Sequence, residues 1–190
     1  MTNLLYFDII VNMQEETQIK FSRKWAMPNH ETFSMKPIGE FVTKYLINSK
    51  ISIDPASRNR EWFTYTNDIN PKTKSQYHLD AVVFLNMLHE KNIKCDLVIL
   101  DLPWTCRQIS ECYKEVGIKV TQKHTQIASF YKQVKDAADK LIEKNGVVLS
   151  FCYNSVGMGI KRGYKIEEIL LVASGGCHND VICLAERKLI

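Results

Sequence analysis

The chain has 190 residues, of which 45% are hydrophobic and 24% are charged, and its formal net charge is +4. This composition excludes a disordered or fibrous protein, and the length predicts one domain over residues 1–190. No apolar run is long enough to span a membrane, and the N-terminus lacks the basic start and cleavage site of a signal peptide, so we expect a cytoplasmic protein without membrane partners.

Apolar runs of strand length alternate with segments of helical period. The predicted strands are residues 51–54, 62–66, 95–101 and 147–152, and the predicted helices are residues 41–47, 81–90 and 125–143. Asn145-Gly146 is a typical helix end, so we expect the long helix to stop there. The alternation predicts an α/β fold with a mainly parallel sheet.

Two β-rich segments, residues 163–176 and 177–190, close the chain and are joined by a polar Gly-Gly loop. Neighbouring strands with no room for a helix between them must pair antiparallel. The sequence therefore predicts a parallel sheet that ends in an antiparallel C-terminal hairpin.

Four acids stand at successive element ends: Asp54, Asp68, Asp80 and Asp101. In an open α/β sheet, ligands bind beyond the carboxyl ends of the strands. Each acid also has a structural explanation, such as a helix N-cap for Asp80 or an Asx-turn for Asp68. Because four acids recur in succession, they favour a shared site, in which Asp68 could accept hydrogen bonds from a ribose.

Glycine-rich phosphate loops are absent from the sequence. Neither the GxGxxG pattern nor the Walker pattern occurs, and no glycine lies near Asp54-Pro55 to let a pyrophosphate approach. A nucleoside ligand without phosphates fits this sequence better than a nicotinamide dinucleotide or a nucleoside triphosphate.

The tetrapeptide Asp101-Leu102-Pro103-Trp104 follows the fourth predicted strand. It resembles the signature of S-adenosylmethionine-dependent N6-adenine DNA methyltransferases, in which an acid, Asn or Ser precedes Pro-Pro and an aromatic residue. Residues 53–59 are similar to the family's cofactor loop, with Arg58 where a glycine is usual, and residues 33–38 are similar to its N-terminal cofactor segment. The likeness covers nearly the whole chain from about residue 23 and is strongest to short phage-type adenine methylases.

The resemblance implies a Rossmann-like, seven-stranded, mainly parallel sheet and transfer of a methyl group to the exocyclic N6 amine of adenine in DNA. Asp101 would accept one N–H of the amine, and the carbonyl of Leu102 would accept the other. Pro103 would hold that carbonyl, because its own φ is fixed. Trp104 would stack on a base flipped out of the duplex.

The same resemblance implies a binding site for S-adenosylmethionine, with S-adenosylhomocysteine as the product. The residues assigned to the cofactor are Phe33, Pro37, Asp54, Pro55, Asp68, Asp80 and Ala81. Asp68 would hold the ribose, and Asp80 with Ala81 would border the adenine. Asp54 and Pro55 would shape the loop beside the methionine part of the cofactor. Phe33 and Pro37 would cover that part.

Residues 105–126 form a predicted basic loop directly after the tetrapeptide. Arg107, Gln108 and Lys123 of this loop are expected to contact DNA, because Arg commonly reads guanine and Gln commonly reads adenine. A second basic cluster, at residues 20–24, fits a solvated surface as well as it fits nucleic-acid contact.

The six cysteines form no CxxC pair and are expected to be free thiols. Cys106, Cys112 and His124 could meet around a metal, but their spacing suits no known zinc motif, so no metal cofactor is predicted.

The sequence leaves several alternatives open. The methyl acceptor could be adenine in RNA or the N4 amine of cytosine, because each is an amine conjugated to a ring. A catalytically weakened or silent homologue that binds nucleic acid as a partner subunit is a third alternative, and a homodimer is also open.

Overall fold

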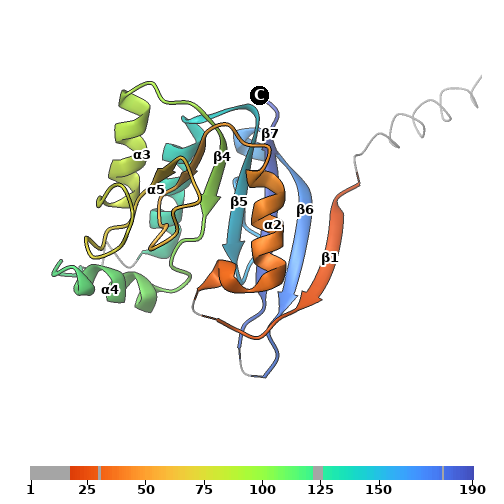
Figure 1. Ribbon diagram of the computed structural model, residues 1–190. Coiled ribbons are helices and arrows are strands. Elements are labelled where there is room, and N and C mark those ends of the chain that lie inside the picture. Colours follow the sequence, from red (N-terminus) through yellow and green to blue (C-terminus); the bar gives the residue numbers. More distant parts are fainter. Residues whose placement is uncertain (1–17, 30, 122–125, 177) are drawn as a thin grey trace, which may run out of the picture.

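The computed structural model describes residues 18–29, 31–121, 126–176 and 178–190. Its centre is a seven-stranded sheet of order β1-β6-β7-β5-β4-β2-β3 (Figure 1). The strands are β1 Lys20–Trp25, β2 Ser52–Asp54, β3 Tyr65–Thr66, β4 Cys95–Leu100, β5 Ile142–Cys152, β6 Tyr164–Ala173 and β7 Val181–Lys188. The helices are α2 Lys36–Leu46, α3 Ala81–Glu90, α4 Cys106–Glu115 and α5 Ile127–Asp139, with 3-10 turns η1 Thr32–Ser34 and η2 Ile160–Arg162.

The predicted hairpin closes the sheet as expected. β7 lies between β5 and β6 and pairs antiparallel with both, whereas β1 with β6, β2 with β3 and β4, and β4 with β5 pair parallel. The prediction of a seven-stranded, mainly parallel α/β sheet with an antiparallel C-terminal hairpin is therefore confirmed.

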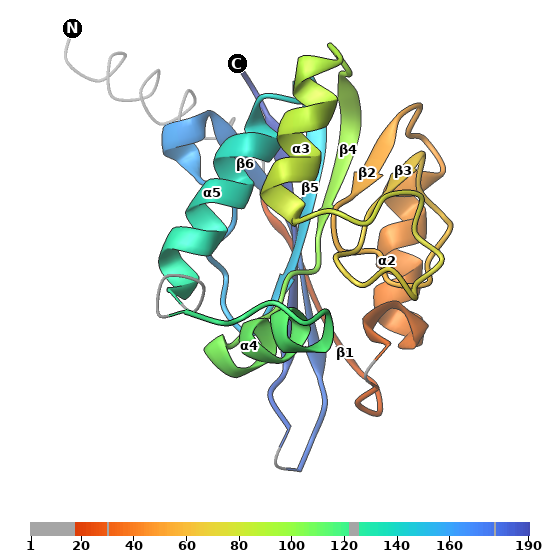
Figure 2. The ribbon, with the colours of Figure 1, turned by 90° about the vertical axis from the view of Figure 1, so that its left-hand side faces the viewer.

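Helices cover both faces of the sheet. Figure 2 shows the sheet nearly edge-on, with α2 on one side and α3 and α5 on the other. Successive residues of β4 point to opposite faces, so Leu97 and Ile99 join the core under α2 while Val98 and Leu100 join the core under α3 and α5. A strand buried on both faces reads as a continuous apolar run, which is why β4 was visible in the sequence.

The predicted end of the long helix is wrong. α5 ends at Asp139 and β5 begins at Ile142, so Asn145-Gly146 lies inside a strand. Asn145 has φ +66, and the pairing register of β4 with β5 shifts between Cys95 and Leu97. The dipeptide thus produces an irregularity in the strand, which explains its turn-like composition.

Three further segments differ from the prediction. Of the strand expected at residues 62–66, only Tyr65–Thr66 is a strand. The expected loop at residues 105–126 contains α4, whose N-terminus is closed by a capping box between Thr105 and Gln108. β1 was not predicted as a strand. No helix in the described residues has both the length and the apolar character needed to cross a membrane.

Candidate active site

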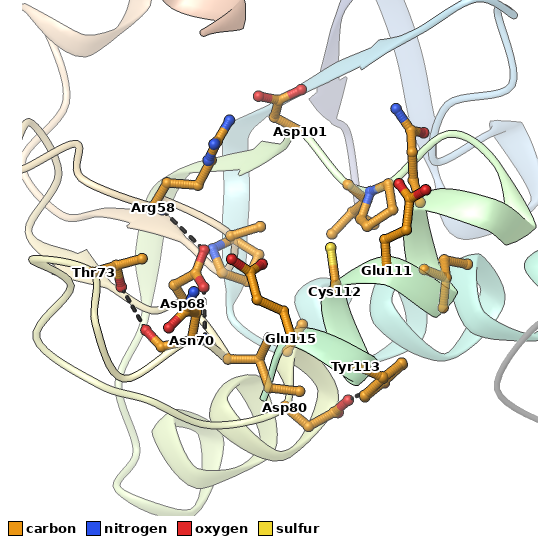
Figure 3. Close-up of a pocket in the computed structure, with 18 of the residues that line it drawn as sticks. Arg58, Asp68, Asn70, Thr73, Asp80, Asp101, Glu111, Cys112, Tyr113 and Glu115 are labelled. Carbon is orange, nitrogen blue, oxygen red and sulfur yellow. Dashed lines mark hydrogen bonds between the residues drawn. The ribbon is translucent and has the colours of Figure 1, made fainter. Parts of the chain in front are cut away.

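A cavity of about 740 Å³ opens at the carboxyl ends of β2, β3 and β4, beside α4 (Figure 3). This volume is typical of a small-molecule site. The sequence-predicted residues on its wall are Pro55, Asp68, Asp80, Ala81, Asp101, Leu102, Pro103, Trp104 and Gln108. Phe33, Pro37, Asp54 and Arg107 do not line it, and Lys123 lies outside the described residues.

A buried arginine joins two of the predicted acids. Nη2 of Arg60 lies 3.3 Å from an oxygen of Asp54 and 3.5 Å from an oxygen of Asp101. The Arg60 guanidinium also lies 4.2 Å from the centre of the Phe33 ring. Asp54 is fully buried, and the side chains of Arg60 and Asp101 are 8% and 10% exposed. No sequence motif pointed to Arg60, which links the loop after β2 to the end of β4.

Burial has a strong effect on these carboxyl groups. It raises the pKa of Asp101 to about 6, although the positive charge of Arg60 acts in the opposite direction. The pKa of Asp54 is also raised by burial and is likewise held down by Arg60. Arg60 therefore favours the ionised form of Asp101 near neutral pH.

Asp68 closes a tight loop and faces the cavity at the same time. Its two oxygens accept hydrogen bonds from the backbone N–H groups of Asn70, at 2.8 Å, and of Arg58, at 3.1 Å. The bond to Asn70 is the expected Asx-turn. Arg58 has φ +54, the left-handed conformation that glycine adopts most readily. The backbone at this position therefore has the conformation that suits the glycine expected from the resemblance, although the residue is arginine.

Asp80 is the N-cap of α3, which is the structural role expected from the sequence. Oδ1 accepts hydrogen bonds from the N–H groups of Val82, at 2.9 Å, and Val83, at 3.4 Å. Oδ2 accepts a 2.6 Å hydrogen bond from the hydroxyl of Tyr113 in α4. Asp80 thereby connects α3 to α4 across the floor of the cavity.

The tetrapeptide after β4 is held by side chains from α4, from α5 and from the segment after β5. The Tyr131 hydroxyl of α5 lies 3.2 Å from the carbonyl oxygen of Pro103 and 3.5 Å from that of Leu102. The Trp104 backbone donates to Oε1 of Gln108 at 2.7 Å and accepts from the Tyr153 hydroxyl at 2.9 Å. Leu102 is only 2% exposed and belongs to the core under α3 and α5, which accounts for leucine at this position.

A second cavity of about 250 Å³ shares Asn29, Thr32, Trp104 and Gln108 with the first. Tyr153 also lines it, with its ring 6.1 Å from that of Trp104 and inclined by 71°. The half-buried Trp104 ring thus borders two adjoining cavities. In this position the ring could lie between two ligands, one in each cavity.

Two of the residues predicted to contact DNA, Arg107 and Gln108, have partners in α4 or at its N-cap. Arg107 is exposed and donates a 2.7 Å bond to Glu111, and Oε1 of Gln108 serves the capping box. Within the described residues, no group of three His, Cys, Asp or Glu side chains could hold a metal ion; His124 lies outside them.

Comparison with known proteins identifies the fold. No family model and no curated protein matches the sequence. Among solved structures, NSun6 from Pyrococcus horikoshii with SFG has a TM-score of 0.55 at 15% identity, over 86% of this chain and 53% of that one. TrmN from Thermus thermophilus has a TM-score of 0.54 at 12% identity, over 82% and 49%. SMU.776, complexed with SAH, has a TM-score of 0.53 at 10% identity, over 77% and 48%.

These likenesses show that the chain has the class I methyltransferase fold. The chain spans about half the length of each of these three solved chains.

Proposed function

We propose that this protein transfers a methyl group from S-adenosylmethionine to the exocyclic N6 amine of adenine in DNA. One observation carries the proposal: Asp101-Leu102-Pro103-Trp104 ends β4 on the wall of the same cavity that Asp68 and Asp80 line. The class I methyltransferase fold supports it, as do the SFG and SAH present in two structures of that fold.

The cavity fits the proposed cofactor in charge and in hydrogen bonding. A carboxylate offers about four acceptor positions, and the loop uses two of those on Asp68, so two remain for the hydroxyls of a ribose. S-adenosylmethionine supplies an activated methyl group on a positive sulfonium, and a wall with several carboxylates suits that charge. The predicted roles of Asp54, Pro55, Asp80 and Ala81 belong to the proposal.

The residues around the acceptor would hold a poorly nucleophilic amine in place. Asp101 accepts one N–H, and the carbonyl of Leu102 accepts the other, which draws the nitrogen towards tetrahedral geometry. Tyr131 and Pro103 fix the backbone that carries this carbonyl. Trp104, at the border of the two cavities, would stack on the extruded base.

The proposal also includes some residue roles that no contact in the structure supports directly. Phe33 packs against the guanidinium of Arg60, and Pro37 lies in the first turn of α2, so neither borders the cavity in this structure. Base reading by Arg107, Gln108 and Lys123 also stays a prediction, as does one domain over residues 1–190.

We expect Asp68→Ala to weaken binding of S-adenosylhomocysteine by about 1.5–3 kcal/mol, because charge-assisted hydrogen bonds to the ribose are lost. The loop around Asn70 also depends on this carboxylate. Asp68→Asn is therefore the matched variant, since its amide oxygen preserves the Asx-turn. Isothermal titration calorimetry measures both affinities, and unchanged affinity in a folded Asp68→Ala protein would remove this residue from the site.

We expect Trp104→Ala to raise the activation free energy of methyl transfer by about 1–3 kcal/mol, because base stacking on the ring is lost. Cofactor affinity should change little. Trp104→Phe keeps an aromatic face and should retain most of the rate. Single-turnover methyl transfer to duplex DNA gives both values. Full activity of the alanine variant would exclude stacking on this ring from the mechanism.

The acceptor is tested by counting tritium transferred from labelled S-adenosylmethionine to three matched substrates. The first two are duplex DNA and RNA of the same sequence. The third is a DNA duplex in which one strand contains cytosine but no adenine and the complementary strand contains adenine but no cytosine. The proposal expects label in DNA only on strands with adenine. Label in RNA alone, or in cytosine-containing strands without adenine, would contradict it in favour of the corresponding alternative.

A further inference from the structure

The outer strand β1 exposes two aromatic rings although it is part of the sheet. It lies at the edge of the sheet with β6 as its neighbour, as Figure 1 shows. Phe21 is 63% exposed and Trp25 is 61% exposed. Alternate residues of a strand share one face, so Arg23 lies between these rings on the same face. We call Phe21, Arg23 and Trp25 the β1 stripe.

The β1 stripe lies on the face of the sheet that α2 does not cover. Lys20 is paired with Glu168 in the register of β1 with β6, and Glu168 also forms an ion pair with Lys44 of α2. Lys20 therefore belongs to the α2 face, and the β1 stripe, one residue out of phase, belongs to the other face. The sequence-predicted basic cluster at residues 20–24 is divided between the two faces.

The charge of the β1 stripe is not neutralised by the described part of the chain. Lys20 lies 3.4 Å from Glu168, and Arg107 of α4 lies 2.7 Å from Glu111. By contrast, Arg23 does not lie within ion-pair distance of any described carboxylate. An exposed cation between two exposed rings is a combination that binds single-stranded nucleic acid, because rings stack on bases and cations contact phosphates.

The β1 stripe also leads into the proposed active site. Phe21 and Trp25 are four residues apart, a distance of about 13 Å along a strand. After β1, the backbone N–H of Ala26 continues the pairing with the carbonyl of Ala173 at 3.1 Å. Asn29, three residues further along the chain, lines both cavities. A strand of nucleic acid on the β1 stripe would thus reach the cavities at the carboxyl edge of the sheet.

We propose that the β1 stripe binds the single-stranded segment of nucleic acid next to the base that enters the active site. This inference rests on the proposed function in taking nucleic acid as the substrate. It adds a contact on β1 to those predicted for residues 105–126, where Arg107 forms an exposed ion pair with Glu111.

The test is fluorescence anisotropy with a labelled single-stranded oligodeoxynucleotide, titrated with the full chain at several salt concentrations. Phe21→Ala/Trp25→Ala should weaken binding at least about tenfold, because stacking on two rings is lost. Arg23→Gln should reduce the slope of log affinity against log salt by about 0.7, as expected for one phosphate contact on a single strand.

The matched control is Ile160→Ala/Lys161→Gln in η2, which precedes β6 and therefore lies at the opposite end of the sheet from the cavities. Ile160 is 87% exposed, so this pair also removes an exposed apolar group, together with an exposed cation. It should bind the oligonucleotide as the unmodified protein does. Circular dichroism and thermal unfolding show whether each variant keeps its fold.

Each outcome decides between the two proposals. If the β1 stripe variants bind the oligonucleotide normally while the unmodified protein methylates DNA, the inference fails and the proposed function stands. If the variants lose binding but the unmodified protein methylates no nucleic acid, the β1 stripe stands and the proposed function fails. Unchanged oligonucleotide binding with altered self-association in sedimentation would assign this face to a second copy of the chain and overturn the inference.

Discussion

Asp101→Ala should lower the single-turnover rate of methyl transfer by about 10²–10³-fold, the usual effect of removing one preorganised hydrogen-bonding group from an active site. The affinity for S-adenosylhomocysteine should change much less, because Asp101 is proposed to contact the acceptor amine. Arg60 keeps Asp54 as a partner in this variant, so the protein should remain folded.

Asp101→Asn is the matched variant for this prediction. Its amide retains one oxygen that can accept an N–H of the amine but carries no charge, so an intermediate rate is expected. Rapid-quench measurements at saturating cofactor provide both rates. If Asp101→Ala transfers methyl groups at the rate of the unmodified protein, the tetrapeptide after β4 does not hold the acceptor.

Arg60→Met should destabilise the protein by about 3–5 kcal/mol at pH 8, because two buried carboxylates lose their partner. Arg162→Met is the matched control, since it removes an arginine from a pair with Asp136 in which both side chains are partly exposed. Such a pair contributes about 0–1 kcal/mol. Urea unfolding at several pH values measures both losses.

The pH dependence of this loss has a definite sign. In the folded protein the pKa of Asp101 is already above the ordinary value of an aspartate. At pH values between the unfolded and the folded pKa, the folded state therefore keeps a proton that the unfolded state has lost. Without Arg60, the pKa of Asp101 and that of Asp54 should rise further. The deficit of Arg60→Met should therefore shrink as the pH falls towards 5, and a deficit that grows on acidification would contradict this account.

The rate of methyl transfer should report the same carboxyl group. In the unmodified protein, the rate should fall as the pH drops through about 6, where Asp101 becomes protonated. The charged groups that act on it are Arg60, Asp54 and Arg58, and Thr32 lies 3.5 Å away as a hydrogen-bond donor. In Arg60→Lys, which keeps the charge, this acid limb should stay near its original pH. In Arg60→Met it should move to higher pH.

The sequence predicted those parts of the fold that have a clear apolar pattern, either continuous or alternating. β4 is buried on both faces and was found, as was the C-terminal hairpin. β1 escaped because its residues are mostly exposed on both faces, so no alternation of apolar and polar residues marks it as a strand. α4 escaped for a related reason: Ile109 is its only fully buried residue among mostly polar neighbours, which gives a helix little apolar signal.

The acids at the strand ends could be predicted because topology alone brings the ends of parallel strands to one edge. Arg60 could not, since its role depends on how closely the loop after β2 approaches the end of β4 in three dimensions. The same holds for Tyr131 and Tyr153, whose hydroxyls fix the tetrapeptide from elements distant in sequence.

Methyl transfer to N6 of adenine can be measured by mass spectrometry of nucleosides from adenine-containing duplex DNA, after incubation with the protein and trideuteromethyl-labelled S-adenosylmethionine. We expect deoxyadenosine with the labelled methyl group on N6, and a strongly reduced amount with Asp101→Ala. Absence of any labelled nucleoside, from a protein that binds the cofactor and the DNA, would contradict this expectation.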